Sequence, residues 1–378
     1  MECLVEKSCG GCKYRSMQED AYRVQKIEKI KRLLALLNEE SFVMNEPVFV
    51  PDGRRRRATF AFEIKKKKLV LGFNKENSKE LVNIENCPLL TKTINNLIPA
   101  LRRFLEEFCA ENYTEKQGKK LVTKTITSGD VFVCEADNGL DIVIECPMKL
   151  ELAHKMIISD FCLQNEKIIR VSHRFSASDE AETLIEKVKP LVKMGKYNVE
   201  IPAGTFLQPS KEGQEILSKL VLKEMSGIKG KIADLFCGVG TFSYVLADLP
   251  DVKIAASDSS KALLKGFKNS INHNQISNIE VVEKNLFKYP PSEEELKTYK
   301  AIVFDPPRAG AAALCQVLAK AEYKLEKIVA VSCNPATFVN DANKLISGGY
   351  HLQEITIVDQ FVYSDHSELV ACFTKEKM

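Results

Sequence analysis

Apolar and polar residues alternate along the chain in patterns that change from one region to the next. Residues 18–38 place apolar side chains at helical spacing, which predicts an amphipathic helix with a basic outer face. Thr59–Ile64 and Leu69–Phe73 are predicted to be strands joined by the turn Lys65–Lys68. The runs DVFVCEA, LDIVIECP and KIIRVSHRF also have the composition of strands. The middle of the chain is therefore expected to be rich in β-structure.

The pattern changes at KIADLFCGVGTFSYVLA, residues 231–247. Ile232–Phe236 is a short apolar run, glycines follow it, and a helical pattern begins at Thr241. This order predicts a strand, a tight turn and a helix. Further strands are supplied by VKIAASDSS, NIEVVEKNLF, KAIVFDPPRAG, KIVAVSCNPAT and ELVACF. We therefore predict two domains, a β-rich domain over residues 1–200 and a Rossmann-like α/β domain with a doubly wound sheet over residues 201–378.

The composition is that of an ordinary globular protein, with 45% apolar and 28% charged residues. No run of about 18 apolar residues is present, which argues against a membrane-spanning protein. The start, MECLVEKSC, lacks the basic and apolar segments of a signal peptide. A reducing cytoplasm is therefore the expected location, where the 12 cysteines stay unpaired. The net charge of +3 is small, so nucleic-acid binding would depend on local basic patches.

Three cysteines near the start follow the pattern C-x5-C-x2-C: Cys3, Cys9 and Cys12. Two glycines lie between the last two and allow a tight loop around a metal centre. The next cysteine, Cys87, precedes a proline, as does the last cysteine of the bacterial ferredoxin pattern. Four thiolates could hold an iron–sulfur cluster or a zinc ion, and the spacing alone does not separate the two.

A basic segment, GRRRRATFAFEIKKKKLVLGF, spans residues 53–73. Its lysine turn has the character of a solvated face. The four arginines differ, because they enter a strand of the domain that holds the cysteines, and guanidinium forks suit phosphate oxygens. The residues predicted on this basis to contact RNA or DNA are Arg54, Arg55, Arg56 and Arg57.

The glycine turn of the second domain follows the pattern D-x-x-x-G-x-G, not the G-x-G-x-x-G of dinucleotide loops. The acid that begins it, Asp234, suits a cationic or amino-bearing ligand, and Asp258 at the end of the next strand can accept ribose hydroxyls. Strand, glycine turn, helix, strand and acid is the layout of S-adenosylmethionine-dependent methyltransferases. The candidate cofactor-binding residues in this half are Phe236, Gly238, Gly240, Asp258 and Asp305.

Two motifs bear on which atom receives the methyl group. FDPPRAG resembles the Asp-Pro-Pro-aromatic motif of enzymes that methylate exocyclic amino groups, but Arg308 stands in place of the aromatic residue. The Pro-Cys pair expected of 5-methylcytosine enzymes is missing. VSCNPATF places Cys333 just past a strand, where its thiolate could add to carbon 6 of uracil and activate carbon 5. Glu368, at the start of the last strand, is the candidate base for removing the proton from carbon 5.

These motifs together resemble the RNA uracil-5-methyltransferase family, folate-independent enzymes that make 5-methyluridine in ribosomal and transfer RNA. The family motifs S-C-N-P, D-P-P-R-x-G, D-L-F-C-G-x-G and H-x-E-x-V are all matched, which implies Cys333 as nucleophile and Glu368 as base. The family's F-x-Q matches residues 206–208 and implies that Gln208 touches the cofactor or the base. The ligands that the resemblance implies for a 4Fe-4S cluster are Cys3, Cys9, Cys12 and Cys87.

The resemblance implies a Rossmann-like class I methyltransferase domain preceded by a β-rich iron–sulfur RNA-binding domain. Structured RNA is the expected substrate of a monomeric enzyme, with the target uridine flipped out of its stack. Among bacterial members the iron–sulfur cysteines go mainly with 23S rRNA enzymes, so 23S rRNA is favoured and tRNA is the alternative. A non-catalytic RNA-binding protein that keeps the fold is the rival from another class, although the presence of both Cys333 and Glu368 argues against it.

The sequence departs from the family pattern at three places. Many members carry a small RNA-binding β-barrel before the cysteines, whereas here the cysteines begin at residue 3. RNA capture is therefore expected to depend on the central domain, including Arg54–Arg57. Asp258 stands where a glutamate is common, which shortens its reach to the ribose. QPSKEG follows where Q-x-N is usual, so a role for that asparagine is not expected here.

Overall fold

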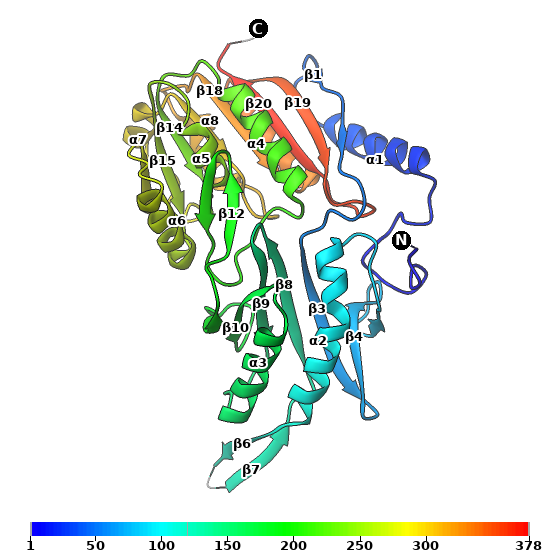
Figure 1. The fold of residues 1–378 in the computed structure, drawn as a ribbon. Coiled ribbons are helices and arrows are strands. Elements are labelled where there is room, and N and C mark those ends of the chain that lie inside the picture. Colours follow the sequence, from blue (N-terminus) through cyan, green and yellow to red (C-terminus); the bar gives the residue numbers. More distant parts are fainter. Residues whose placement is uncertain (1, 119, 377–378) are drawn as a thin grey trace. The chain divides into compact units, whose positions relative to one another are not determined.

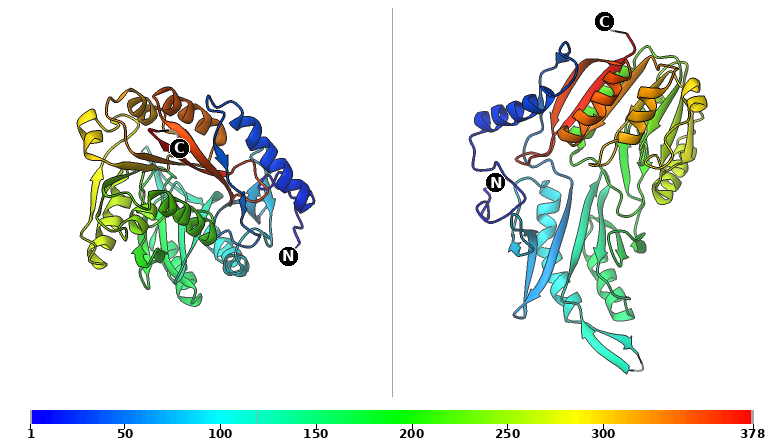
Figure 2. Two further views of the ribbon diagram at one scale, coloured as in Figure 1. Left: turned by 90° about the horizontal axis from the view of Figure 1, so that it is seen from above. Right: turned by 180° about the vertical axis from the view of Figure 1, so that it is seen from behind.

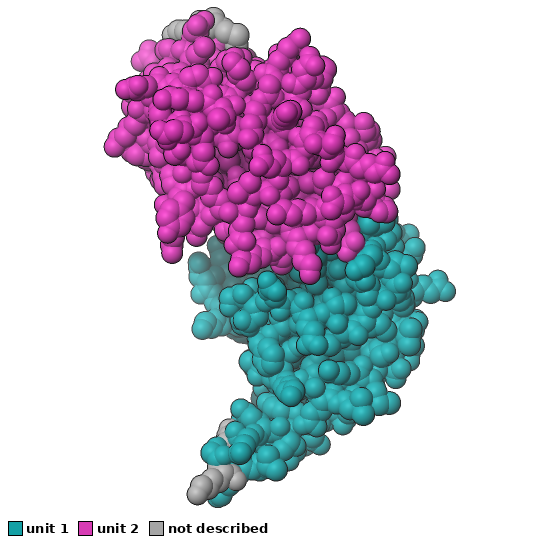
Figure 3. Space-filling view, turned by 90° about the vertical axis from the view of Figure 1, so that its left-hand side faces the viewer, with its two compact units in different colours: residues 1–15, 52–192, 201–210 teal, residues 16–51, 193–200, 211–378 magenta. Residues whose placement is uncertain are grey.

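The computed structural model describes residues 2–118 and 120–376 and divides the chain into two compact units. The first unit comprises residues 1–15, 52–192 and 201–210, and the second comprises residues 16–51, 193–200 and 211–378 (Figure 3). A single boundary at residue 200, as predicted from the sequence, does not describe this division. The reason is that residues 16–51 pack with the second unit although they precede most of the first.

The first unit is built on a mixed sheet with the strand order β11-β10-β9-β8-β3-β4-β5. Its strands are β3 (Arg57–Lys65), β4 (Lys68–Asn74), β5 (Leu81–Asn83), β8 (Ser128–Ala136), β9 (Gly139–Glu145), β10 (Ile168–Arg174) and β11 (Glu182–Glu186). Helices α2 (Lys92–Ala110) and α3 (Leu152–Gln164) share its apolar core, and β6 (Asn112–Gln117) pairs with β7 (Lys120–Thr125) as a separate hairpin (Figure 1). The predicted β-rich character of this region is confirmed.

The hairpin of β3 and β4 forms at the lysine turn, as predicted. Lys65 pairs with Lys68, so that Lys66 and Lys67 alone make the turn, with φ angles of 49° and 62°. Two positive φ values in a two-residue loop give the turn a twist that matches the flanking strands. All four lysines of this turn are exposed, so they form a solvated face.

The second unit is a doubly wound sheet with the strand order β1-β19-β20-β18-β17-β14-β15-β16, and β2 also pairs with β19. Pairs along β18, β17, β14, β15 and β16 are parallel, whereas β20 runs antiparallel to both β18 and β19. Helices α8 (Ala312–Lys320) and α9 (Pro335–Ser347) cover one face, and α4 (Lys211–Met225) covers the other (Figure 2). The strands are β1 (Val43–Met44), β2 (Val48–Phe49), β14 (Gly230–Leu235), β15 (Val252–Asp258), β16 (Ile279–Glu283), β17 (Ala301–Phe304), β18 (Lys327–Ser332), β19 (His351–Asp359) and β20 (Glu368–Thr374).

The remaining elements of this unit are short or peripheral to the sheet. Strands β12 (Leu191–Met194) and β13 (Tyr197–Glu200) pair with each other where the chain passes between the units. The helices are α1 (Glu19–Leu34), α4 (Lys211–Met225), α5 (Thr241–Leu246), α6 (Lys261–His273), α7 (Glu293–Thr298), α8 (Ala312–Lys320) and α9 (Pro335–Ser347). No helix within residues 2–118 and 120–376 is long and apolar enough to cross a membrane.

Helix α1 confirms the predicted amphipathic helix but belongs to the second unit. Its buried residues Ile30 and Leu34, with Leu37 just beyond the helix, join the apolar core that contains the sheet and helices α8 and α9. Strand β1 then continues the sheet by pairing with β19 (Figure 1). Burial of this apolar face holds residues 16–51 on the second unit, which the local pattern of the helix could not show.

The sheet topology brings several strand ends to one edge. In a parallel sheet all carboxyl ends lie on the same side, here those of β14, β15, β17 and β18. Strand β19 also ends there, because it is antiparallel to β20, which is antiparallel to β18. The amino end of β20 therefore lies at the same edge. Every predicted catalytic residue, and every predicted cofactor residue of the second unit, follows or begins one of these strand ends.

Candidate active site

The glycine turn after β14 has the backbone conformation that its sequence predicts. Phe236, Gly238 and Gly240 all have positive φ angles, of 62°, 55° and 91°. A Cβ atom at Gly240 would lie 2.3 Å from the ring of Phe267, so packing as well as conformation requires glycine there. At Gly238 a Cβ atom would meet nothing within 4 Å, which leaves the backbone open to a ligand.

Asp258, the last residue of β15, is tied to this turn. Its Oδ2 accepts a hydrogen bond from the backbone N–H of Gly238 at 3.1 Å, and its Oδ1 accepts one from Ser260 at 2.9 Å. Both bonds fix the carboxylate at the sheet edge beside the open face of the turn. This is the position in which an acid can accept ribose hydroxyls.

Asp234 has a structural contact in the protein, and the ligand-binding role suggested by its sequence position stays a prediction. It is 1% exposed, and its Oδ2 accepts a hydrogen bond of 2.5 Å from the hydroxyl of Ser243 on α5. Burial, to which the charges of Asp305 and Asp258 add, raises the pKa of Asp234 to about 7. Through Oδ2 the side chain thus joins β14 to α5 beneath the turn.

Cys333 follows β18 directly and begins the turn into α9. Asn334 caps that helix by accepting a hydrogen bond from Ala336 at 3.2 Å, and its amide donates to the carbonyl of Arg308 at 3.2 Å. The S-C-N-P and D-P-P-R segments are therefore joined at the sheet edge. Asp305 begins the second of these segments, and its backbone N–H donates to Leu235 at 3.3 Å.

The surroundings of Cys333 keep its thiol protonated. Burial, together with the negative charges of Glu368 and Asp305, raises the pKa of Cys333 to about 11, and the Arg308 guanidinium acts in the opposite direction. Two carboxylates are thus close enough to influence the sulfur. At neutral pH the free protein has a thiol here, not a thiolate.

Glu368 is the first residue of β20 and is 2% exposed. It pairs in register with Val358 of β19, and its Oε1 accepts a hydrogen bond of 3.2 Å from the side-chain amide of Gln360. Gln360 was not identified from the sequence, because β19 was not recognised as a strand. The alternation in HLQEITIVD, residues 351–359, was the available signal.

In the first unit, the four cysteines predicted as cluster ligands influence one another. Burial, followed by the neighbouring thiols of Cys87 and Cys9, raises the pKa of Cys12 to about 12, and Cys3 adds a smaller effect in the same direction. Burial also raises the pKa of Cys87, whereas the backbone N–H groups of Leu89 and Leu90 lower it. All four are free thiols of intermediate exposure. The fold has therefore brought Cys87 to the loop of residues 3–12.

Four thiolates can hold a single ion or a cluster, and the two need different spacings of the sulfurs. Within residues 2–118 and 120–376, no group of three or more Cys, His, Asp or Glu side chains is arranged to hold one metal ion. A tetrahedral zinc site needs its four sulfurs about 2.3 Å from one point. A four-iron cluster places each thiolate on a different iron and spaces the sulfurs more widely. The backbone N–H of Gly11 also points at the sulfur of Cys9, at 3.4 Å, as donors to cluster sulfurs do.

Asn95 and Arg55 support this group of cysteines, and neither role was identified from the sequence. The amide of Asn95, on α2, holds the backbone of Cys87 through two hydrogen bonds. Arg55 is half-buried, and burial lowers its pKa. The nearby sulfurs of Cys87 and Cys12 act in the opposite direction and offset part of this effect. A cation beside thiolates favours their charged form.

The four arginines predicted to contact RNA differ in their exposure and in the groups that they contact. Arg54 is exposed, so RNA contact through it stays a prediction. Arg56 is 4% exposed, and its Nε donates to the carbonyl of Gln208 at 3.0 Å, so its guanidinium is engaged within the protein and RNA contact through it stays a prediction. Arg57 lies 4.0 Å above the ring of Phe206. Arg56 and Arg57 thus hold residues 206–208 within the first unit.

Gln208 is placed by this contact but remains untested as a cofactor ligand. Its carbonyl is bound by Arg56, and Arg56 also donates its backbone N–H to Pro209 at 2.8 Å. Gln208 belongs to the first unit, whereas the other predicted cofactor residues belong to the second. The predicted contact between Gln208 and cofactor or base therefore stays a prediction.

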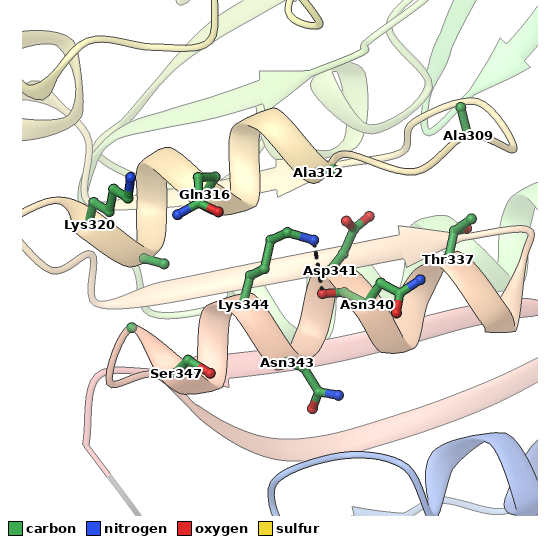
Figure 4. Close-up of a pocket in the computed structure, with 12 residues that line it drawn as sticks. Ala309, Ala312, Gln316, Lys320, Thr337, Asn340, Asp341, Asn343, Lys344 and Ser347 are labelled. Carbon is green, nitrogen blue, oxygen red and sulfur yellow. Dashed lines mark hydrogen bonds between the residues drawn. The ribbon is translucent and has the colours of Figure 1, made fainter.

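A cavity of about 560 Å³ lies between α8 and α9, away from these residues. Figure 4 shows Gln316 and Lys320 on one helix and Asn340, Asp341 and Lys344 on the other, with Lys344 donating to the carbonyl of Asn340 at 3.4 Å. The predicted site residues all lie in the described part of the chain, and none of them lines this cavity. It is separate from the strand-end site.

Comparison with known proteins agrees with this geometry. Residues 184–376 match the family model described as tRNA (uracil-5-)-methyltransferase. An uncharacterized RNA methyltransferase of Brucella melitensis biotype 1 is 34% identical over 99% of this chain and 84% of its own length. The 23S rRNA (uracil(1939)-C(5))-methyltransferase RlmD of Mannheimia succiniciproducens is 27% identical over 99% of this chain and 82% of its own length.

The fold is shared with a solved structure. The tRNA (uracil-54, C5)-methyltransferase of Pyrococcus abyssi, in complex with S-adenosyl-L-homocysteine, superimposes with a TM-score of 0.71 over 97% of this chain and 86% of that chain, at 23% identity. The predicted fold, a Rossmann-like methyltransferase domain preceded by a β-rich domain, is confirmed. The chain belongs to the RNA (uracil-5-)-methyltransferase family and is an S-adenosylmethionine-dependent enzyme of that family.

Proposed function

We propose that this enzyme methylates carbon 5 of a specific uridine in 23S rRNA through a covalent adduct with Cys333. One observation supports the proposal above all others. The sheet brings a thiol at the end of β18 and a carboxylate at the start of β20 to the edge that also holds the glycine turn. A nucleophile, a base and a cofactor turn are the groups that methylation at carbon 5 of uracil requires.

Cys333 and Glu368 act at different steps. The sulfur of Cys333 adds to carbon 6, and the electron pair of the carbon 5–carbon 6 double bond makes carbon 5 nucleophilic. S-adenosylmethionine supplies the methyl group that carbon 5 takes. Glu368 then removes the proton from carbon 5, the double bond re-forms, and the bond between carbon 6 and sulfur breaks to return the thiolate. Because the Cys333 thiol is protonated in the free protein, it must lose its proton before or as the sulfur adds to carbon 6.

The cofactor is proposed to bind along the ends of β14, β15 and β17. The open backbone at Gly238 admits the ligand, the fixed carboxylate of Asp258 accepts ribose hydroxyls, and Asp305 lies at the next strand end. The ring of Phe236, packed 5.3 Å from that of Phe287, forms an apolar wall. Gln208 is proposed as a further contact to the cofactor or to the target base.

We also propose that Cys3, Cys9, Cys12 and Cys87 hold a 4Fe-4S cluster that keeps the first unit in shape. Support comes from the mutual influence of the four thiols and from the N–H donors to sulfur. Anaerobically purified protein should be brown, with about four iron and four sulfide per chain. A colourless protein with one zinc per chain would contradict the proposal.

The choice of 23S rRNA is supported by the similarity, over 99% of this chain, to a relative that is named for that substrate. The cysteine pattern discussed above favours the same substrate. Transfer RNA is the alternative, because the family model and the superimposed structure are named for tRNA. We propose further that the enzyme is a monomer and acts in the cytoplasm, where its cysteines stay reduced.

The substrate is tested by incubating the purified protein with labelled S-adenosylmethionine and with unmodified 23S rRNA or tRNA. A single 5-methyluridine mapped in 23S rRNA is the expected result. Methylation of tRNA alone would replace the proposed substrate but keep the reaction. If neither RNA gains 5-methyluridine while both bind, the protein is the non-catalytic RNA-binding rival.

A further inference from the structure

A buried ionic group joins α1 to the end of β19. Lys26 and Asp359 form an ion pair of 2.9 Å, with side chains only 2% and 1% exposed. The hydroxyl of Tyr22, one helical turn before Lys26, donates to the other oxygen of Asp359. Figures 1 and 2 show α1 lying beside the part of the chain that holds β19 and β20. A buried ion pair of this kind is weak evidence for stability and is better explained by specificity of arrangement.

The same two side chains hold the loop that follows β19. Lys26 donates to the carbonyl of Ser364 at 2.6 Å, and the backbone N–H of Tyr363 donates to the hydroxyl of Tyr22 at 2.9 Å. The hydroxyl of Ser364 in turn accepts a hydrogen bond from the backbone N–H of His366 at 3.2 Å. Residues 360–367 are thus fixed at the end of β19 and again at the approach to β20.

This loop connects directly to the proposed base. Gln360 follows Asp359 and donates to Glu368 at 3.2 Å. At the other end, Glu368 is the second residue after His366. Both ends of the loop between β19 and β20 therefore connect α1 to the carboxylate of Glu368. Breaking the ion pair would loosen both ends together.

We propose that α1, through Lys26 and Tyr22, is a positioning element for Glu368. This inference rests on the proposed role of Glu368 in taking the proton from carbon 5. The buried pair fixes the loop, and the loop orients the carboxylate toward that proton. Loss of the pair slows proton removal, the re-formation of the carbon 5–carbon 6 double bond and the release of Cys333. It leaves the addition of Cys333 and the methyl transfer unchanged, because the bonds of Lys26 and Tyr22 described above go to Asp359 and residues 363–364, not to Cys333.

The test compares Lys26→Met and Asp359→Asn with Lys31→Met, which removes an exposed lysine of the same helix that pairs with Glu28 at 3.2 Å. Single-turnover reactions use RNA with deuterium at carbon 5 of the target uridine. The first two variants should release product about 10- to 100-fold more slowly, since complete loss of a general base costs roughly 10²–10⁴. They should accumulate methylated covalent complex and show a primary isotope effect. Lys31→Met should match the native enzyme in all three measurements.

A single substitution leaves one buried charge without its partner and can prevent folding. The double variant Lys26→Met/Asp359→Asn removes both charges and repeats the test in that case. Native melting temperature with product release at the native rate and no isotope effect would overturn the inference. Glu368→Gln separates this failure from a failure of the proposed function. If Glu368→Gln traps the covalent complex and the variants of Lys26 and Asp359 do not, only the role of α1 is wrong.

Discussion

Asn95 holds the backbone of Cys87 on both sides of the residue. Its Oδ1 accepts the N–H of Cys87 at 2.8 Å, and its Nδ2 donates to the carbonyl of Cys87 at 3.0 Å. Asn95 is 8% exposed, on the buried side of α2. The helix therefore fixes the one cysteine of the proposed cluster that is distant in sequence from the other three.

Replacing Asn95 with leucine should make the cluster labile, because the backbone of Cys87 loses both hydrogen bonds. We expect bleaching in air to be several times faster than in the native protein, measured by visible absorbance and iron content. Asn96→Leu is the matched control, since Asn96 is the next residue of α2 and is exposed. Equal bleaching rates in the two variants would show that Asn95 does not support the cluster.

Cys333→Ala and Glu368→Gln should fail at different steps. Without the sulfur, no covalent complex and no 5-methyluridine should form, although cofactor still binds. Without the carboxylate, addition and methylation proceed, and the protein should remain attached to methylated RNA as a slow band on a denaturing gel. Loss of the base typically costs roughly 10²–10⁴ in rate. Full turnover by either variant would mean that the role assigned to that residue is wrong.

The pH dependence of Cys333 reactivity follows from its surroundings. With burial and two carboxylates raising its pKa to about 11, the thiolate fraction at pH 7 is about 10⁻⁴ and rises tenfold per pH unit. Alkylation by iodoacetamide, followed by mass spectrometry of the Cys333 peptide, should therefore accelerate up to about pH 10 without a plateau.

Two variants give opposite shifts in this profile. Glu368→Gln removes a negative charge, so it should lower the pKa of Cys333 and speed alkylation at a given pH. Arg308→Gln removes a positive charge and should slow it. A plateau near pH 8, or the same direction of change in both variants, would contradict this account of the thiol.

Arg54→Ala and Arg56→Ala should have different consequences although the residues are close in sequence. Arg54 is exposed, so its loss should weaken RNA binding and reduce the salt dependence by about one ion, with unchanged melting. Arg56 is buried on the carbonyl of Gln208, so its loss should destabilise the protein by about 1–3 kcal/mol. Thermal melting and filter binding at several salt concentrations check both. Equal effects on binding would support Arg56 as an RNA contact.

Alanine substitutions at the two glycines of the cofactor turn should have different effects on stability and on cofactor binding. Alanine at position 240 would place its Cβ 2.3 Å from the Phe267 ring and should destabilise the protein. Alanine at position 238 meets nothing within 4 Å, so its cost is only the strain of the positive φ, about 1 kcal/mol, while S-adenosylmethionine binding weakens. Calorimetry of unfolding and of cofactor binding measures the two effects. Cofactor affinity unchanged in Gly238→Ala would remove that backbone from the proposed site.

Local patterns in the sequence were sufficient for features whose cause is local. The strands of both sheets alternate or form apolar runs, the β3–β4 hairpin forms at the lysine turn, and α5 begins after the glycines. The meeting of Cys333, Glu368 and Asp258 at one edge of the sheet could be predicted, because each residue ends, follows or begins a recognisable strand. In an open α/β sheet the ends of such strands meet at one edge.

Other features depend on contacts between residues far apart in the chain, and only the tertiary structure decided them. Arg56 turns inward because the carbonyl of Gln208 meets it, and Asp234 is buried because α5 packs over β14. Helix α1 could be predicted as a helix, but its periodicity is the same whichever core it joins. The pairing of Lys26 with Asp359, 333 residues later by subtraction of their numbers, places α1 beside the proposed base. A sequence pattern records which face of a helix is apolar, and only the packed sheet determines what that face covers.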